Sequence, residues 1–276
     1  MNRIDIILSQ LKTSGKKMLS PYITAGDPHP DMTVQLMHEL VKAGADILEL
    51  GIPFSDPMAE GPVIQHAMER ALAHRVYCQD VLKMVKAFRQ QDNKTPVVIM
   101  GYLNPIEQYG YDLFAQHAVE AGVDGTILVD LPPEESDEVV RIWKQYGLYG
   151  IYLCSPTTSK ERMVLINQLG QGYLYYVSLK GVTGSDSLDM TSLKFQYNYL
   201  KAQTSLPLMV GFGIKTPEMA AEVVGFADGV IVGAALITQI IDAYTTHKNS
   251  LQAGASLMHS MRQAIDNHGK PNDRTH

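Results

Sequence analysis

The sequence predicts a single α/β domain built as a closed (β/α)₈ barrel, a TIM barrel, with an extra helix before the first strand. Short runs of apolar, branched residues recur along the 276-residue chain, and segments with helical periodicity separate them. Strands without polar alternation are typical of a parallel sheet that is covered on both faces. The length also fits, because one such barrel takes roughly 250 residues.

The elements are expected in the following order. Residues 4–11 begin the chain as a helix, because their apolar side chains follow helical spacing. Strands are expected at residues 18–24, 46–52, 96–102, 125–130, 150–154, 172–178, 207–211 and 229–232. The clearest helical stripes between them lie within residues 32–41, 81–88 and 139–143. Strands that alternate with amphipathic helices indicate right-handed βαβ units.

A short phrase recurs before three of the expected strands. It reads AGAD at 43–46, AGVDG at 121–125 and FADG at 226–229. Its glycine is typical of a helix end that the next strand follows. No linker interrupts the units, so residues 1–266 are expected to form one barrel domain and the polar residues 267–276 a disordered tail.

Composition disfavours several classes of protein. The formal net charge is −6 without a long basic run, whereas a nucleic-acid binder needs cationic surface to replace phosphate counterions. Two cysteines without CxxC spacing favour reduced thiols in the cytoplasm over a disulfide scaffold or a zinc ribbon. Nine histidines without HExxH spacing predict no metal site. No apolar run reaches the roughly 18 residues that predict a membrane span.

Two carboxylates are the candidate acid–base groups, because barrel active sites lie beyond the carboxyl ends of the strands. Glu49 lies inside an otherwise apolar strand, where desolvation raises a carboxyl pKa toward neutrality and suits it to proton transfer. The alternative is a structural Glu that pairs with a lysine or with backbone amides. Glu60 lies in the loop that follows, near the same barrel mouth, although a Glu at a helix N-terminus is also common.

Three glycine-bearing turns are candidate anion sites: 181–184 (GVTG), 211–213 (GFG) and 233–235 (GAA). The last two follow the expected seventh and eighth strands, where barrels of this kind commonly bind phosphate through backbone amides and a helix N-terminus. The alternative is a tight turn that needs glycine for its backbone angles. Tyr175 and Tyr176 lie in the sixth strand, and alternation directs only one of them into the barrel.

Taken together, these residues resemble the tryptophan synthase alpha chain family. The resemblance rests on residues 21–28 (PYITAGDP), 49–62 (ELGIPFSDPMAEGP), 130–135 (DLPPEE), 181–184 and 211–214 (GFGI), which run in family order. The segment 49–62 is the most specific of them. The resemblance implies a barrel lyase of tryptophan biosynthesis that cleaves indole-3-glycerol phosphate to indole and glyceraldehyde 3-phosphate by a retro-aldol step.

The resemblance also implies roles for individual residues. Glu49 matches the family's acid/base carboxylate, Glu60 the carboxylate that faces the indole N–H, and Tyr175 a tyrosine beside the substrate. The residues that match the phosphate-binding backbone are Gly184, Phe212, Gly213, Gly233 and Ala234, and Thr183 matches a mobile-loop residue that closes on the second carboxylate. An aromatic substrate is further favoured by the apolar and aromatic residues at the strand ends: Tyr22, Met100, Tyr102, Ile127, Val129 and Leu153.

The sequence departs from the family pattern at several of these positions. Glu60 stands where the family has Asp, so its carboxylate is one methylene farther from the backbone. Ala234 stands where Ser is usual, which keeps the amide but removes one hydroxyl donor to phosphate. Leu179 and Lys180 replace loop residues among which Arg is common, and Lys180 is either a substitute cation or a solvated lysine.

The family acts with a beta chain that carries pyridoxal phosphate and receives indole through a tunnel. The resemblance therefore implies an α2β2 tetramer and no cofactor in this chain. The residues expected on the partner-facing side are Pro53, Asp56, Asn104, Pro132 and Glu135.

Two other functions are open from the residues alone. One is a different phosphate-binding barrel, such as an isomerase or aldolase of small sugar phosphates, which needs the glycine turns but no indole pocket. The other is an alpha chain whose own catalysis is weakened through Glu60 and Ala234 and which acts mainly as an activator of the beta chain.

Overall fold

The computed structural model describes residues 1–178, 189–211 and 213–268. Within these residues, nine parallel strands form one sheet in the order β5-β4-β3-β2-β1-β9-β8-β7-β6. The strands are β1 (Met18–Thr24), β2 (Leu48–Gly51), β3 (Val97–Gly101), β4 (Gly125–Leu128), β5 (Tyr149–Gly150), β6 (Leu153–Cys154), β7 (Leu174–Val177), β8 (Leu208–Gly211) and β9 (Gly229–Val232).

The barrel closes at the expected fifth strand, which differs from its prediction. In place of one strand at 150–154, the chain forms the two short strands β5 and β6, with Ile151 and Tyr152 between them. The Ile151 amide still donates to Thr126 of β4 at 2.9 Å, and the Tyr175 amide of β7 donates to Tyr152 at 3.0 Å. The segment thus pairs with β4 through its first half and with β7 through its second half, which joins the two edges of the sheet.

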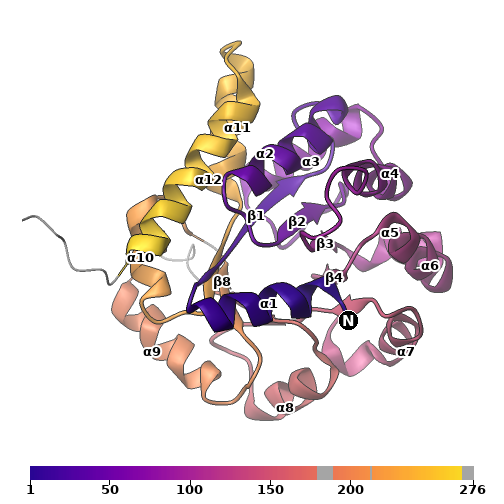
Figure 1. The fold of residues 1–276 in the computed structure, drawn as a ribbon. Coiled ribbons are helices and arrows are strands. Elements are labelled where there is room, and N and C mark those ends of the chain that lie inside the picture. Colours follow the sequence, from indigo (N-terminus) through magenta and orange to yellow (C-terminus); the bar gives the residue numbers. More distant parts are fainter. Residues whose placement is uncertain (179–188, 212, 269–276) are drawn as a thin grey trace, which may run out of the picture.

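Helices surround the barrel (Figure 1). They are α1 (Arg3–Ser14), α2 (Thr33–Lys42), α3 (Pro62–Ala73), α4 (Cys78–Phe88), α5 (Leu103–Tyr109), α6 (Tyr111–Ala121), α7 (Asp137–Tyr146), α8 (Lys160–Leu169), α9 (Met190–Lys201), α10 (Pro217–Val224), α11 (Ala234–Thr245) and α12 (Ser250–Asn267), with short 3₁₀ turns at Pro30–Met32 and Pro133–Glu135. In the described part of the chain, no helix is both long enough and apolar enough to cross a membrane.

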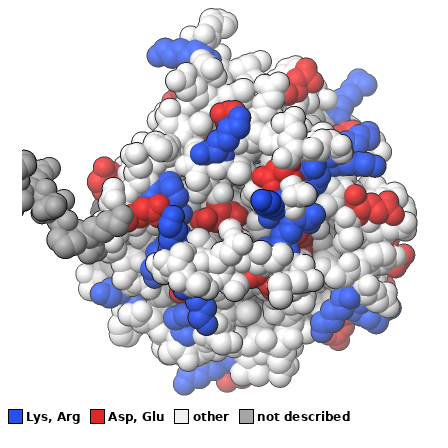
Figure 2. All heavy atoms as spheres, viewed as in Figure 1, with Lys and Arg blue, Asp and Glu red and all other residues white. Residues whose placement is uncertain are grey.

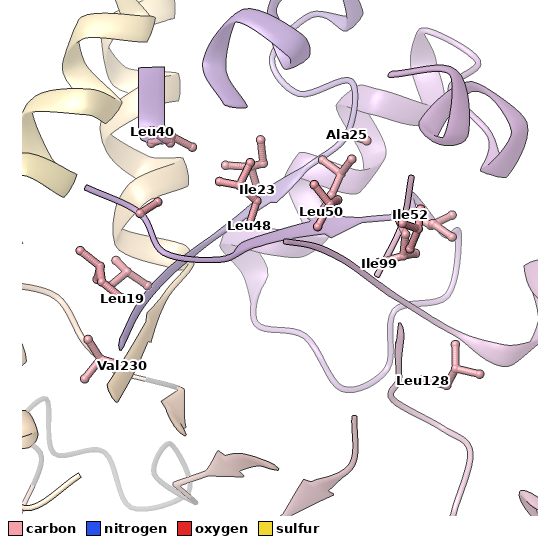
Figure 3. Packing of buried hydrophobic residues seen from close by; sticks show 14 of the residues in the cluster. Leu19, Ile23, Ala25, Leu40, Leu48, Leu50, Ile52, Ile99, Leu128 and Val230 are labelled. Carbon is pink, nitrogen blue, oxygen red and sulfur yellow. The ribbon is translucent and has the colours of Figure 1, made fainter. Parts of the chain in front are cut away.

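Alternation along the strands produces two apolar layers. Side chains such as Leu19, Ile23, Leu48, Leu50 and Ile99 point outward and pack against the helices (Figure 3). The residues between them face the barrel interior and form a second cluster, which includes Met18, Tyr22, Val98, Ile127 and Met209. Because side chains alternate between the two faces of a strand, every second residue is available to build a site inside the barrel.

Helix α1 crosses the end of the barrel at which the strands begin (Figure 1). Asn2 caps it by accepting a hydrogen bond from the Ile4 amide, and the side chains of Ile4 and Leu11 are buried in the inner cluster. The Tyr149 hydroxyl donates to Asp5 at 2.6 Å. The predicted N-terminal helix is therefore confirmed, and its apolar stripe fills the amino end of the barrel.

The recurring phrase AGAD, AGVDG and FADG has one structural function. In each copy the Asp precedes a strand, and its carboxylate accepts a hydrogen bond from a backbone amide at the start of the neighbouring strand. The pairs are Asp46 with Leu19 at 2.9 Å, Asp124 with Val97 at 2.9 Å, and Asp228 with Leu208 at 2.8 Å. Each Asp also pairs with a cation, namely Arg262, Arg89 and Lys201. Figure 2 shows the end of the barrel that α1 crosses, and acidic and basic side chains are interspersed on this face.

Candidate active site

Glu49 lies inside the barrel, on strand β2, which pairs with β1 on one side and with β3 on the other. Its neighbours Leu48 and Leu50 point outward to the helices (Figure 3), so Glu49 points inward. In register, Glu49 is paired with Tyr22 of β1 and with Val98 of β3, both of which belong to the inner cluster. The side chain is 0% exposed. The sequence-based prediction of a carboxylate that faces the barrel interior is thereby met.

The two oxygens of the Glu49 carboxylate have different surroundings. Oε1 accepts a hydrogen bond of 2.7 Å from the hydroxyl of Tyr173. Oε2 is buried and has no hydrogen-bond partner among the described residues. Burial raises the pKa of the carboxyl to about 8, although the hydrogen bond from Tyr173 lowers it. Near neutral pH such a group exchanges a proton readily in either direction, as a general acid or base must.

Glu60 lies between β2 and α3, in the loop that follows Glu49 along the chain. Its side chain is partly buried, and burial raises its carboxyl pKa to about 7. Its charge acts on Tyr22 and on Tyr175, since it raises the pKa of both phenols after the larger contribution of burial. Glu49 acts on the same two phenols. The fold therefore brings both candidate carboxylates to one pair of tyrosines.

Tyr22 and Tyr175 face into the barrel because small residues make room for them. A Cβ on Gly51 would overlap the Tyr22 ring, and a Cβ on Gly211 would overlap the ring of Tyr175. Tyr175 belongs to the inner cluster and Tyr176 to the outer one, as alternation requires. A glycine at each of these two strand ends is thus a steric condition for the aromatic walls of the site.

The other predicted pocket residues divide into two groups. Met100, Ile127, Val129 and Leu153 belong to the inner cluster or pack against it, together with Tyr22 and Tyr175. Tyr102 lies at the end of β3 and is 1% exposed, and its hydroxyl accepts a hydrogen bond of 3.0 Å from the amide of Ala59. Tyr102 thus contacts the loop that carries Glu60.

The predicted phosphate site is described only in part. Gly233 is the N-cap of α11, and Ala234 is the first residue of this helix. Among the described residues, no side chain caps the helix. The first amides of a helix have no partner within it, so this N-terminus presents donors to an anion. Gly213 follows β8 with a φ of 80°, a conformation that favours glycine. Phe212, Thr183, Gly184, Leu179 and Lys180 lie outside the described residues.

Tyr173 is the site residue that the sequence reasoning missed. It is 0% exposed and directly precedes β7, which lies across the barrel from β2. A signal was present, because residues two apart in a strand share a face and Tyr173 precedes the predicted inward-facing Tyr175 by two. Its partner Glu49 is 124 residues away in the sequence, so no local pattern links the two.

The residues expected to face a partner are not all on the surface. Asp56, Asn104 and Glu135 are exposed, and Pro132 is partly buried. Pro53 is buried within the chain, which corrects its placement on a partner-facing surface. The chain turns outward only after Pro53, since Ser55 is the first exposed residue of the loop.

The fold and these groups together define a class of protein: a (β/α)₈ barrel with two carboxyl groups of raised pKa beside an aromatic-walled interior, a setting suited to proton transfer. Among the described residues, no group of three or more His, Cys, Asp or Glu side chains could hold a metal ion. Catalysis by carboxyl groups of shifted pKa is a common use of such sites.

Comparisons with known proteins identify the family. A sequence model of the tryptophan synthase alpha chain matches residues 8–266, and the chain belongs to this family. It is 74% identical over 269 residues to the tryptophan synthase alpha chain of Legionella pneumophila (strain Corby), covering 98% of this chain and 99% of that one. It is 52% identical to the alpha chain of Marinobacter nauticus over 266 residues, covering 96% and 98% of the two chains.

Solved structures agree with this assignment. The crystal structure of tryptophan synthase subunit alpha from Legionella pneumophila str. Paris superposes with a TM-score of 0.93 at 71% identity, over 97% of this chain and 99% of that one. The M. tuberculosis tryptophan synthase, in an open form with BRD0059 bound, has a chain that superposes with a TM-score of 0.85 at 29% identity, over 96% of this chain and 99% of that chain. The barrel predicted from the sequence is confirmed.

Membership in the family defines the reaction. The chain is a lyase of tryptophan biosynthesis that cleaves indole-3-glycerol phosphate. In tryptophan synthase the alpha chain carries no cofactor, and pyridoxal phosphate belongs to the beta chain.

Proposed function

We propose that Glu49 is the acid and base of the cleavage, in which it protonates C3 of the indole and removes the proton of the adjacent glycerol hydroxyl. Proton transfer to C3 turns the ring into an indoleninium cation. Loss of the hydroxyl proton then forms the aldehyde as the carbon–carbon bond breaks, and its electron pair returns to the ring. The observation that carries this proposal is the buried carboxylate, of which one oxygen accepts a hydrogen bond from Tyr173 and the other has no hydrogen-bond partner among the described residues.

Glu60 is proposed as the second carboxylate, which accepts the indole N–H and stabilises the positive charge that develops on the ring nitrogen. Its proximity to Tyr22 and Tyr175 supports this role. The additional methylene relative to Asp moves the carboxylate by roughly one C–C bond length, and misplacement of that order reduces rates by about 10²-fold. The loop backbone or the side-chain rotamer therefore has to compensate.

The substrate's two ends are proposed to occupy different parts of the barrel mouth. The phosphate accepts hydrogen bonds from the amides at Gly213, Gly233 and Ala234, and the family resemblance adds Gly184 and Phe212. The indole ring lies among the apolar and aromatic side chains of the inner cluster, namely Tyr22, Met100, Ile127, Val129, Leu153 and Tyr175. Thr183 is proposed to close on Glu60, as the resemblance implies.

Substitution of Glu49 by Gln tests the proposal. Release of indole from indole-3-glycerol phosphate is measured for the wild-type chain, Glu49→Gln and Glu60→Ala, with circular dichroism as the check that each variant folds. Abolished turnover in a folded Glu49→Gln variant supports the role, and retained turnover refutes it. Glu60→Ala is expected to be nearly inactive, whereas Glu60→Asp preserves or raises the rate because it restores the family's shorter side chain.

A weakened alpha chain is the second candidate function, and Glu60 together with Ala234 favours it. Such a chain would raise the activity of a beta chain while cleaving little substrate itself. Turnover of indole-3-glycerol phosphate with the beta chain titrated in distinguishes the two functions. Binding of indolepropanol phosphate further separates an indole site from a site for small sugar phosphates, since only the former needs room for two fused rings.

The assembly proposed for the chain is an α2β2 tetramer with the tryptophan synthase beta chain, which would receive indole through a tunnel. Asp56, Asn104 and Glu135 are exposed and remain available to such a partner. The proposed compartment is the cytoplasm, since both cysteines are free and buried. Residues 1–266 are proposed as one barrel domain, with the helix α12 ending at Asn267 and a tail beyond it.

A further inference from the structure

The loop that carries Glu60 contacts Tyr102 at two points. The hydroxyl of Tyr102 accepts a hydrogen bond of 3.0 Å from the Ala59 amide, which is one residue before Glu60. The Tyr102 ring stacks on the ring of Phe54, near the start of the loop, with a centroid distance of 5.2 Å and an interplanar angle of 27°. The loop is therefore attached to Tyr102 near both of its ends.

The remaining hydrogen bonds of this loop that involve described residues are local. The Met58 amide donates to Asp56 at 2.8 Å, and the Glu60 amide donates to Pro57 at 3.1 Å. The Gln65 side chain, from the first turns of α3, donates to the carbonyl of Glu60 at 2.8 Å. These bonds shape the turn and join it to α3. The bond between Ala59 and Tyr102 connects the turn to the barrel itself.

Tyr102 is a rigid point of attachment. It directly follows β3, is the N-cap of α5, and is 1% exposed. By contrast, Met58 is 77% exposed and Ala59 is exposed. A buried side chain on the barrel thus holds a segment that otherwise lies in solvent, and exposed segments of this kind are mobile unless they are fixed by such contacts.

We propose that Tyr102 is a positioning residue for the cleavage reaction, in which its hydroxyl and ring fix the loop so that Glu60 meets the indole nitrogen. This inference rests on the role of Glu60 in the proposed function. No hydrogen bond among the described residues reaches the Glu60 carboxylate, so its place is determined by the backbone beside it. Because Glu60 is longer than the family's Asp, a fixed backbone is the condition for a reproducible position of the carboxylate.

The chemistry of the Tyr102 hydroxyl fits this role. Burial raises its pKa to about 12, so the hydroxyl is neutral in the working range of an enzyme. A neutral phenol accepts the Ala59 hydrogen bond through an oxygen lone pair and keeps its own hydrogen as a donor. Phenylalanine at this position would keep the ring contact with Phe54 and lose only the hydroxyl.

The test compares Tyr102→Phe, Glu60→Ala and the double variant. We expect Tyr102→Phe to lower kcat/KM by about 2- to 10-fold, the effect of one hydrogen bond. In the Glu60→Ala background the same change should alter the residual rate by less than about 2-fold, since groups that act through one another are not additive. Deuterium exchange should rise in the peptide that covers residues 53–61. The control is Tyr109→Phe, which removes a hydroxyl that bonds to His117 at 2.8 Å and should change neither readout.

The outcomes separate this inference from the proposed function. Wild-type activity and unchanged exchange in Tyr102→Phe, beside an inactive Glu60→Ala, refute the positioning role alone. An equal loss of rate in both backgrounds also refutes it, because Tyr102 would then act independently of Glu60. Full activity of Glu60→Ala refutes the second carboxylate of the proposed function, and the positioning role with it.

Discussion

Replacing Glu49 by Gln should stabilise the folded chain while it removes the cleavage activity. The Glu49 carboxyl has an ordinary pKa of 4.5, and burial raises it to about 8 in the fold. The folded state therefore favours the neutral acid, whereas the unfolded chain ionises freely above pH 4.5. A carboxyl raised in this way contributes its full stability below the unfolded pKa and loses that contribution as the pH rises toward 8. Glutamine stays neutral throughout, so Glu49→Gln escapes this loss.

The magnitude follows from the two pKa values. The difference corresponds to about 5 kcal/mol of unfolding free energy above pH 8, about 3 kcal/mol at pH 7 and below about 1 kcal/mol at pH 5. Glutamine has nearly the same shape as glutamic acid, and its carbonyl oxygen can accept the hydrogen bond of Tyr173. Little else is therefore expected to change in the barrel interior.

The assay is urea unfolding of both proteins between pH 5 and pH 9. The stability gap between Glu49→Gln and the wild type should widen with pH and level off above pH 8. Glu222→Gln, which removes an exposed carboxyl on α10, controls for the loss of one acidic group and should show no such widening. A gap that stays constant over this range would refute the reasoning, because it would mean that Glu49 ionises in the fold as easily as in the unfolded chain.

Three further predictions concern the site and the barrel. Tyr173→Phe removes the hydrogen bond that lowers the Glu49 pKa, so the pH profile of kcat should shift to higher pH and the rate at neutral pH should change; an unmoved profile would contradict this. Asp124→Asn breaks the buried ion pair with Arg89, whose atoms lie 2.9 Å apart. It should reduce the unfolding free energy by about 3–5 kcal/mol, as measured by urea titration. A loss below about 1 kcal/mol would show that the pair contributes little. Ala234→Ser adds a hydroxyl at the N-terminus of α11 and should lower KM by about 2- to 12-fold with kcat unchanged; steady-state kinetics measure it, and an unaltered KM would place the phosphate elsewhere.

Much of the fold follows from patterns that are local in the sequence. The runs 18–24 and 229–232 coincide with β1 and β9, and the other strands differ by one or two residues at their ends, except the fifth. The fifth strand was wrong because apolar character indicates burial but does not say which neighbour a residue pairs with. Residues 149–154 divide their pairing between β4 and β7, which is a property of barrel closure.

A site residue could be predicted where its side chain is chemically unusual among its neighbours in the sequence. Glu49 is conspicuous because a carboxylate is unusual in an apolar strand, and the structure places it in the barrel interior. Tyr173 could not be predicted in the same way, since an aromatic residue in a buried strand is ordinary and its partner lies across the barrel. Pro53 was misplaced because the sequence does not reveal where a loop turns from the interior toward solvent.

Helix α1 affects where substrate and products enter and leave the barrel. The side chains of Ile4 and Leu11 are 0% and 7% exposed, and they fill the amino end of the barrel. We therefore expect substrate and products to enter and leave at the carboxyl ends of the strands, on the side of the barrel away from α1. A protein that receives indole directly would then be expected to bind at this end, where the exposed residues Met58 and Asp56 lie.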